Sequence, residues 1–185
     1  MPAPVGRALG ALALAGVAGL TWSLVEAHAY TLREVTVPVL APGERALRVL
    51  HLSDLHLTPG QHRKIAWLRS LADLEPDLVV DTGDNMAHAD ALGALLHALE
   101  PLMGLPGAFV MGSNDYYAPR AKNPARYLTP DARDGRVAEL EALPAGALAA
   151  ALTAAGWADL TNRRDGVGVD GRRVSLVGVD DPHLD

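Results

Sequence analysis

The sequence contains no cysteine and carries less positive than negative charge. The absence of cysteine excludes disulfides, thiolate metal sites and cysteine nucleophiles, so any metal site must use oxygen and imidazole ligands. The 16 lysines and arginines stand against 22 aspartates and glutamates, a formal net charge of −6. Proteins that bind nucleic acid by neutralising phosphates usually carry a basic face. We therefore expect no nucleic-acid partner.

Charge is also missing from the N-terminal stretch Ala8–Val25. As a helix rising about 1.5 Å per residue, it would span about 27 Å, close to the hydrocarbon thickness of a bilayer. We expect residues 1–29 to be a membrane anchor and residues 30–185 to form the domain. The motif Ala27-His28-Ala29 leaves cleavage as a signal peptide open. A single-pass protein with an extracytoplasmic domain is expected, and secretion after signal cleavage is the alternative.

Strand-like and helix-like patterns alternate along the rest of the chain, which predicts an α/β fold with a parallel sheet. Two features stand apart from this alternation. The first is an edge strand predicted at Tyr30–Val39, and the second is a hairpin at Val167–Val179 that turns at Asp170-Gly171. The alternating elements are buried strands at Ala46–Leu52, Leu78–Val80, Gly107–Met111 and Ala158–Leu160, and helices at 61–74, 89–103, 143–156 and, within a long surface excursion, Arg136–Ala142.

Polar motifs follow the first three of these strands, at His51–His56, Asp81–Asn85 and Gly112–Asp115. The carboxyl ends of parallel strands meet at one edge of a sheet, so the motifs should lie together. Asp54 and His56 are two residues apart, and an extended backbone would point both side chains the same way. Each motif alone is a common turn. The three together predict a site for metal ions.

In this site the Asp84 carboxylate is placed to bridge two ions roughly 3.5–4 Å apart, since it has two oxygens. Gly83 would let the backbone come close. His51 lies within the first strand, and packing explains it better than metal binding.

The motifs Asp54-Leu-His56, Gly83-Asp84-Asn85 and Gly112-Ser-Asn-Asp115 resemble the first three blocks of the calcineurin-like metallophosphoesterase superfamily. The leading hydrophobic segment resembles its membrane-anchored or exported bacterial branch. The resemblance implies a β-sandwich flanked by helices, with a phosphate mono- or diester as substrate and two divalent ions (Mn, Fe or Zn) as cofactors. It implies that Asp54 and His56 bind the first ion, that Asp84 bridges both, and that the third block gives an amide ligand to the second.

The third block departs from the family pattern, which is usually Gly-Asn-His-Asp or Gly-Asn-His-Glu. Here Ser113 stands in the amide-ligand position and Asn114 in the histidine position. Either Asn114 binds the second ion, or Ser113 or a water does. We assign Asn114 and Asp115 as candidate catalytic residues. Asn114 can donate a hydrogen bond to the phosphoryl group but not a proton, and Asp115 has no histidine to orient.

The family's Gly-His-x-His block does not occur before Asp185, and His183, the only histidine after His97, is not expected to be a ligand. We therefore expect the chain to resemble the N-terminal part of a longer enzyme, with an incomplete fold and only part of the site. The alternative is an inactive membrane-tethered fragment or a non-catalytic binding module. A dinucleotide-binding domain is disfavoured, because no Gly-x-Gly-x-x-Gly follows the first strand.

Overall fold

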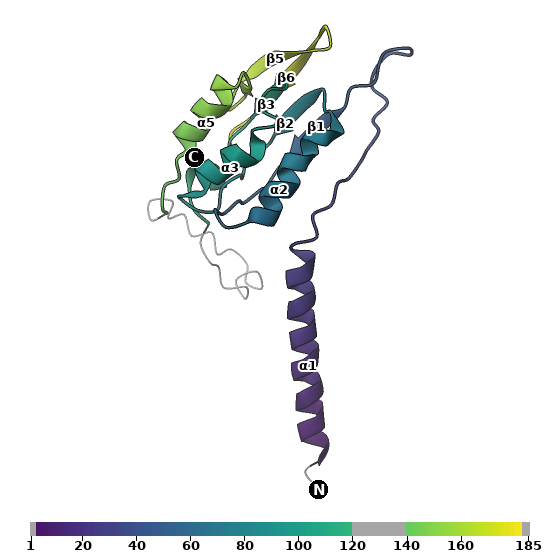
Figure 1. Ribbon diagram of the computed structural model, residues 1–185, viewed down its shortest axis with the longest axis vertical. Coiled ribbons are helices and arrows are strands. Elements are labelled where there is room, and N and C mark those ends of the chain that lie inside the picture. The colour runs from purple at the N-terminus through teal and green to yellow at the C-terminus, as the bar shows by residue number, and fades with distance from the viewer. Residues whose placement is uncertain (1–2, 120–139, 183–185) are drawn as a thin grey trace. The chain divides into compact units, whose positions relative to one another are not determined.

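The computed structural model describes residues 3–119 and 140–182, which form two units, Met1–Val39 and Leu40–Asp185. In the first unit, helix α1 covers Ala3–Glu26 (Figure 1). Its stretch Ala8–Glu26 is long and apolar enough to cross a membrane, a test that a signal sequence also meets. The expected N-terminal apolar helix is confirmed.

The strand predicted at Tyr30–Val39 is wrong, because the structure describes residues 30–39 without any strand. The prediction relied on alternating β-forming side chains. Alternation makes a segment compatible with a strand, but the strand forms only where a neighbour accepts and donates its backbone hydrogen bonds. The described residues provide no such partner for this segment.

A four-stranded parallel sheet organises the second unit, in the order β1-β2-β3-β4. The strands are short and rich in Val, Leu and Ala, as in sheets that are buried on both faces. Their bounds are β1 Val49–Leu52, β2 Leu78–Asp81, β3 Gly107–Phe109 and β4 Ala158–Asp159. All four lie within the predicted strands or extend them by one residue, so the α/β prediction is confirmed.

Helices connect these strands. Between β1 and β2 come α2 His62–Ser70 and the 3₁₀ helix η1 Leu71–Leu74, which ends at Glu75 in a left-handed conformation (φ 49°). Between β2 and β3 lies α3 Ala91–Leu99. The connection to β4 holds α4 Ser113–Tyr116 and α5 Ala145–Ala154. The predicted helix Arg136–Ala142 lies mostly outside the described residues, and residues 140–142 are not helical.

Helices α2, α3 and α5 cover one face of the sheet (Figure 1). Successive side chains of β1 point to opposite faces of the sheet, so Leu50 and Leu52 both point into this core. They lie there with Val79 of β2 and Phe109 of β3. Each helix contributes a buried stripe, which consists of Ile65 and Leu68 from α2, Leu95 and Leu99 from α3, and Leu148 and Leu152 from α5. Because the helices cover this face only, residues of opposite parity, such as Val80, point to the other face.

The predicted hairpin is confirmed, with β5 Arg164–Val169 paired antiparallel to β6 Arg172–Val177 as a separate two-stranded sheet. Its turn residues, Asp170 and Gly171, both have positive φ (49° and 73°). Two successive left-handed residues are the requirement of a type I′ turn, which Asp-Gly meets at low cost.

Candidate metal centre

The loops after β1 and β2 run side by side at the carboxyl edge of the sheet, joined by backbone hydrogen bonds. This pairing continues the register of β1 and β2 beyond the strands, and it ends in a bridge between Leu57 and Met86. The bonds run from the amides of Asp54, His56 and Leu57 to the carbonyls of Gly83, Asp84 and Asn85, at 3.0, 2.9 and 2.8 Å. These backbone bonds fix the two loops relative to each other.

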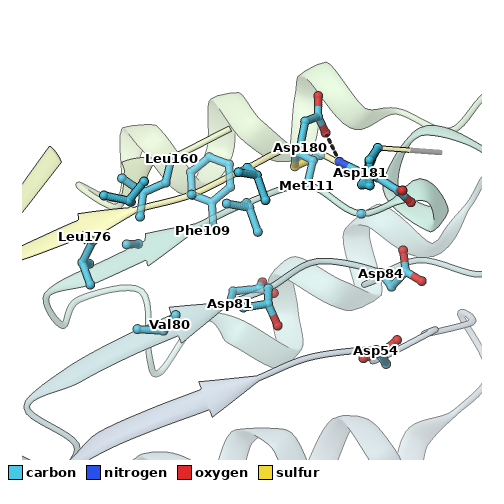
Figure 2. Close-up of a pocket in the computed structure, with 18 residues that line it drawn as sticks. Asp54, Val80, Asp81, Asp84, Phe109, Met111, Leu160, Leu176, Asp180 and Asp181 are labelled. Atoms are coloured by element: carbon cyan, nitrogen blue, oxygen red, sulfur yellow. Dashed lines mark hydrogen bonds between the residues drawn. The ribbon is translucent and has the colours of Figure 1, made fainter. Parts of the chain in front are cut away.

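Three candidate ligands meet on these loops. One ligand atom each from Asp54, His56 and Asp84 lies within 4.8 Å of the others. His56 Nε2 is 3.8 Å from Asp54 Oδ1 and 3.8 Å from Asp84 Oδ2. The Asp54 side chain is the most exposed (67%) and that of Asp84 the least (22%). Figure 2 shows Asp54 and Asp84 on their neighbouring loops. Two carboxylates and an imidazole form a donor set that fits a divalent ion such as Mn, Fe or Zn.

The convergence of Asp54 and His56 does not come from an extended backbone, and that part of the prediction is wrong. Asp54, His56 and Asp84 all have left-handed φ values, of 54°, 40° and 58°. Such values are uncommon outside glycine and cluster at functional sites, where the surrounding structure imposes them. Here the backbone bonds between the two loops impose them. The side chains meet because the chain turns at each ligand.

Two glycines allow this close approach. Gly83 has a φ of 86°, and a Cβ there would lie 2.3 Å from the backbone nitrogen of Gly112. A Cβ on Gly112 would in turn lie 2.3 Å from Asp84 Oδ1. Neither position can take a side chain without moving the loops. The close approach expected at Gly83 is therefore present.

The third block contacts the first two through Asn114. Its backbone amide donates to Asp84 Oδ1 at 2.8 Å, and its side-chain nitrogen donates to Asp84 Oδ2 at 3.0 Å. Ser113 opens α4, and its side chain makes no hydrogen bond to this group in the described part of the chain. The structure thus brings Asn114, rather than Ser113, against the candidate bridging carboxylate.

Asp115 lies beneath the loops with 0% exposure. Its Oδ2 accepts the amides of Asp84 and Gly112, and its Oδ1 accepts that of Asn85, all at 2.9 Å. Burial raises the pKa of the Asp115 carboxyl, and the three N–H donors oppose that rise. Asp115 therefore holds the β2 and β3 loops together from below and does not face solvent.

His51 and His88 are not part of the candidate metal-ligand group. His51 is exposed and shares a hydrogen bond with Thr82 Oγ1 (2.9 Å), so the expectation that it packs within the strand is wrong. The strand is at the sheet edge, and its alternation turns His51 away from the helical core. His88 Nδ1 accepts the amide of Asp90 ahead of α3. His183 lies outside the described residues.

The cluster borders a trough of about 500 Å³ on the sheet face that the helices leave uncovered (Figure 2). Asp54 and Asp84 line it together with apolar side chains such as Val80 and Leu176. A ligand in this trough has direct access to the two carboxylates.

Asp81 and Asn85, the two ends of the second polar motif, form a buried polar pair under the loops that the sequence pattern does not predict. Each is 1% exposed, and Asn85 Nδ2 donates to Asp81 Oδ1 at 3.2 Å. Burial raises the pKa of Asp81 to about 7, the charge of Asp115 adds to the rise, and the Gly83 and Asn85 hydrogen bonds oppose it. The sequence signal for Asp81 is its position as a carboxylate directly after the apolar run Leu78–Val80.

Fold and site together define an α/β protein with a group of carboxylate and imidazole side chains, able to hold a metal ion, at the carboxyl edge of a parallel sheet. Within this class the chain belongs to the calcineurin-like phosphoesterase family, whose profile matches residues 47–172. This membership and the Asp54, His56 and Asp84 group support metal-dependent phosphoester hydrolysis as the general chemistry.

A curated relative from Bos taurus, described as a transmembrane protein with metallophosphoesterase domain, is 34% identical over 99 residues. The matched stretch is 51% of this chain and 22% of the relative, so the chain spans about a fifth of that protein's length. The relative is described as a transmembrane protein, and in this chain the stretch Ala8–Glu26 is long and apolar enough to cross a membrane.

Proposed function

We propose that this chain contributes a half-site to a two-metal phosphoesterase that hydrolyses a phosphate mono- or diester. Asp54 and His56 hold the first ion, Asp84 bridges both, and Asn114 provides an amide ligand for the second. The observation that carries the proposal is the approach of three ligand atoms within 4.8 Å, with the Asn114 side chain 3.0 Å from Asp84. When bound, the two ions supply Lewis-acid stabilisation of the phosphoryl oxygens and lower the pKa of the attacking water.

The residues of the chain have separate parts in this chemistry. Asp84 is fixed by the two Asn114 bonds and by the Asp115 carboxylate, so both of its oxygens have a set direction. Asn114 can donate a hydrogen bond to a phosphoryl oxygen as charge develops there, but it has no proton to give a leaving group. Asp115 acts by positioning this loop, since it is buried.

The apolar helix α1 and the description of the relative as a transmembrane protein support a membrane location. We propose that residues 1–29 anchor the chain and that residues 30–185 form the phosphoesterase domain on the extracytoplasmic side, with signal cleavage and secretion as the alternative. We propose no nucleic-acid partner for this domain, because the chain's net charge of −6 does not favour binding to nucleic-acid phosphates.

The test is Mn²⁺ binding and Mn²⁺-dependent hydrolysis of an aryl phosphodiester by the full chain in detergent micelles. Asp84→Asn removes one bridging oxygen and should abolish Mn²⁺ binding, together with any hydrolysis that the wild type shows. Asp90→Asn is the matched control, because that side chain is 85% exposed and outside the cluster. Binding that the wild type and Asp84→Asn share equally would refute the metal assignment. Binding without hydrolysis would fit a chain that carries only part of the site. It would fit equally the second candidate, a non-catalytic module, which is considered because Asn114 stands where the family usually has a histidine.

A further inference from the structure

Two buried oxygens lie without a hydrogen-bond partner in the described chain, directly below the candidate metal loops. They are Asp81 Oδ2 and Asn85 Oδ1. Their side chains already face each other, since Asn85 Nδ2 donates to Asp81 Oδ1 at 3.2 Å. If Asp81 were ionised, both free atoms would be acceptors. A buried acceptor without a donor is costly, and two of them on facing groups repel each other.

One proton on Asp81 would give both of these buried oxygens a hydrogen-bond partner. A carboxylic acid and a primary amide are complementary, because the amide N–H donates to one carboxyl oxygen while the acid O–H donates to the amide oxygen. A proton on Asp81 Oδ2 would be a donor for Asn85 Oδ1 once the two side chains, which already share one hydrogen bond, adopt this paired arrangement. The structure already contains the first of these two hydrogen bonds, from Asn85 Nδ2 to Asp81 Oδ1.

Asp115 makes the neutral form of Asp81 the favourable one. It is the charged group in the described structure whose field raises the Asp81 pKa. Asp115 accepts three backbone amides, whereas Asp81 accepts one, from Gly83 at 2.9 Å. When two buried carboxyls compete, the one with more N–H donors keeps the negative charge and the other keeps the proton.

Asn85 connects the Asp81 side chain to the loops that carry the candidate ligands. Its backbone amide bonds to Asp115, and its carbonyl accepts the amide of Leu57, next to His56. A shift of the Asn85 side chain would therefore disturb both ligand loops. We propose that Asp81 retains its proton in the folded protein and, paired with Asn85, is a positioning residue that holds the loops carrying Asp84 and His56. The positioning role rests on the proposed function, whereas the retained proton does not.

The proton is tested by infrared difference spectroscopy of the full chain in detergent micelles, comparing wild type with Asp81→Asn. We expect a carboxylic-acid carbonyl band in the wild type at about pH 5 that is absent from the variant and fades by about pH 9. Identical acid bands in the two proteins would overturn the proposal.

The positioning role is tested with Mn²⁺ alone as the probe. Asp81→Asn reproduces the protonated acid, because its Nδ2–H can donate to Asn85 Oδ1, and Mn²⁺ affinity should stay within about 2-fold of wild type. Asp81→Leu fills similar space without hydrogen bonds and should weaken Mn²⁺ binding about 10-fold or more, as loss of an outer partner does at metal sites. Equal loss in both variants would overturn the proposal. A wild type that binds no Mn²⁺ would overturn the proposed function and the positioning role, while the infrared band would still decide the proton.

Discussion

The replacement Asp115→Asn should lower the stability of the domain strongly, although it changes a single atom type. Asp115 is wholly buried and accepts three backbone amides at 2.9 Å. An asparagine oriented with its oxygen toward Asp84 and Gly112 keeps two of these bonds in neutral form. Its NH₂ group then faces the amide of Asn85, donor against donor.

The magnitude follows from these contacts. Hydrogen bonds to a charged group contribute about 1.5–3 kcal/mol, and a buried donor left without an acceptor costs about 1–3 kcal/mol. One lost bond, one donor conflict and two weakened bonds are not additive. We therefore expect the free energy of unfolding to fall by about 3 kcal/mol. That is a large part of the roughly 5–15 kcal/mol that stabilises a typical domain.

The assay is equilibrium urea unfolding of the full chain in detergent micelles, followed by tryptophan fluorescence. Trp157 is 2% exposed and Trp67 packs against the core, so both should report the loss of the domain. The matched control is Asp90→Asn, an exposed carboxylate whose removal should change stability by less than about 0.5 kcal/mol. An Asp115→Asn protein as stable as this control would refute the assigned role of the three amide bonds.

Four further outcomes are expected in the same preparation. Burial raises the pKa of Asp81 from 3.8 to about 7; because the folded value is the higher one, its stabilising contribution is complete below about pH 4 and is lost as the pH rises through about 7. At about 1.4 kcal/mol per pKa unit, the free energy of unfolding falls by at most about 4 kcal/mol over this pH range. In urea unfolding at several pH values, Asp81→Asn should reduce this dependence on pH. Gly83→Ala should destabilise by about 3 kcal/mol or more, since its Cβ would lie 2.3 Å from a backbone nitrogen at a φ of 86°. In contrast, Gly93→Ala, which meets nothing within 4 Å in helix α3, should stabilise by about 0.5–1 kcal/mol. Tyr116→Phe should remove the tyrosinate step at about pH 12 from an ultraviolet titration, because burial and Asp180 raise the pKa of Tyr116; a step that persists would contradict this assignment.

Some of these features follow from the sequence because they depend on local rules. A helix at Ala8–Val25 requires only an uncharged apolar run of sufficient length, and the structure forms it as part of α1. The turn at Asp170-Gly171 depends on two residues that tolerate positive φ. The meeting of the three motifs at one edge follows from the alternation of strands and helices.

Pairing between distant segments is what the sequence left open. The pattern at Tyr30–Val39 suits a strand, but no strand partner for it occurs among the described residues. The motif puts Ser113 in the amide-ligand position and Asn114 in the histidine position, whereas the fold turns Asn114 toward Asp84.

The sequence by itself determined which residues could bind a metal, because carboxylate, imidazole and amide side chains after buried strands are a local signal. Tertiary structure decided how they meet, through the left-handed turns at Asp54 and His56 that only the paired β1 and β2 loops enforce. It also created the Asp81 and Asn85 pair above Asp115, since burial and the sharing of one proton depend on groups that come together only when the chain is folded.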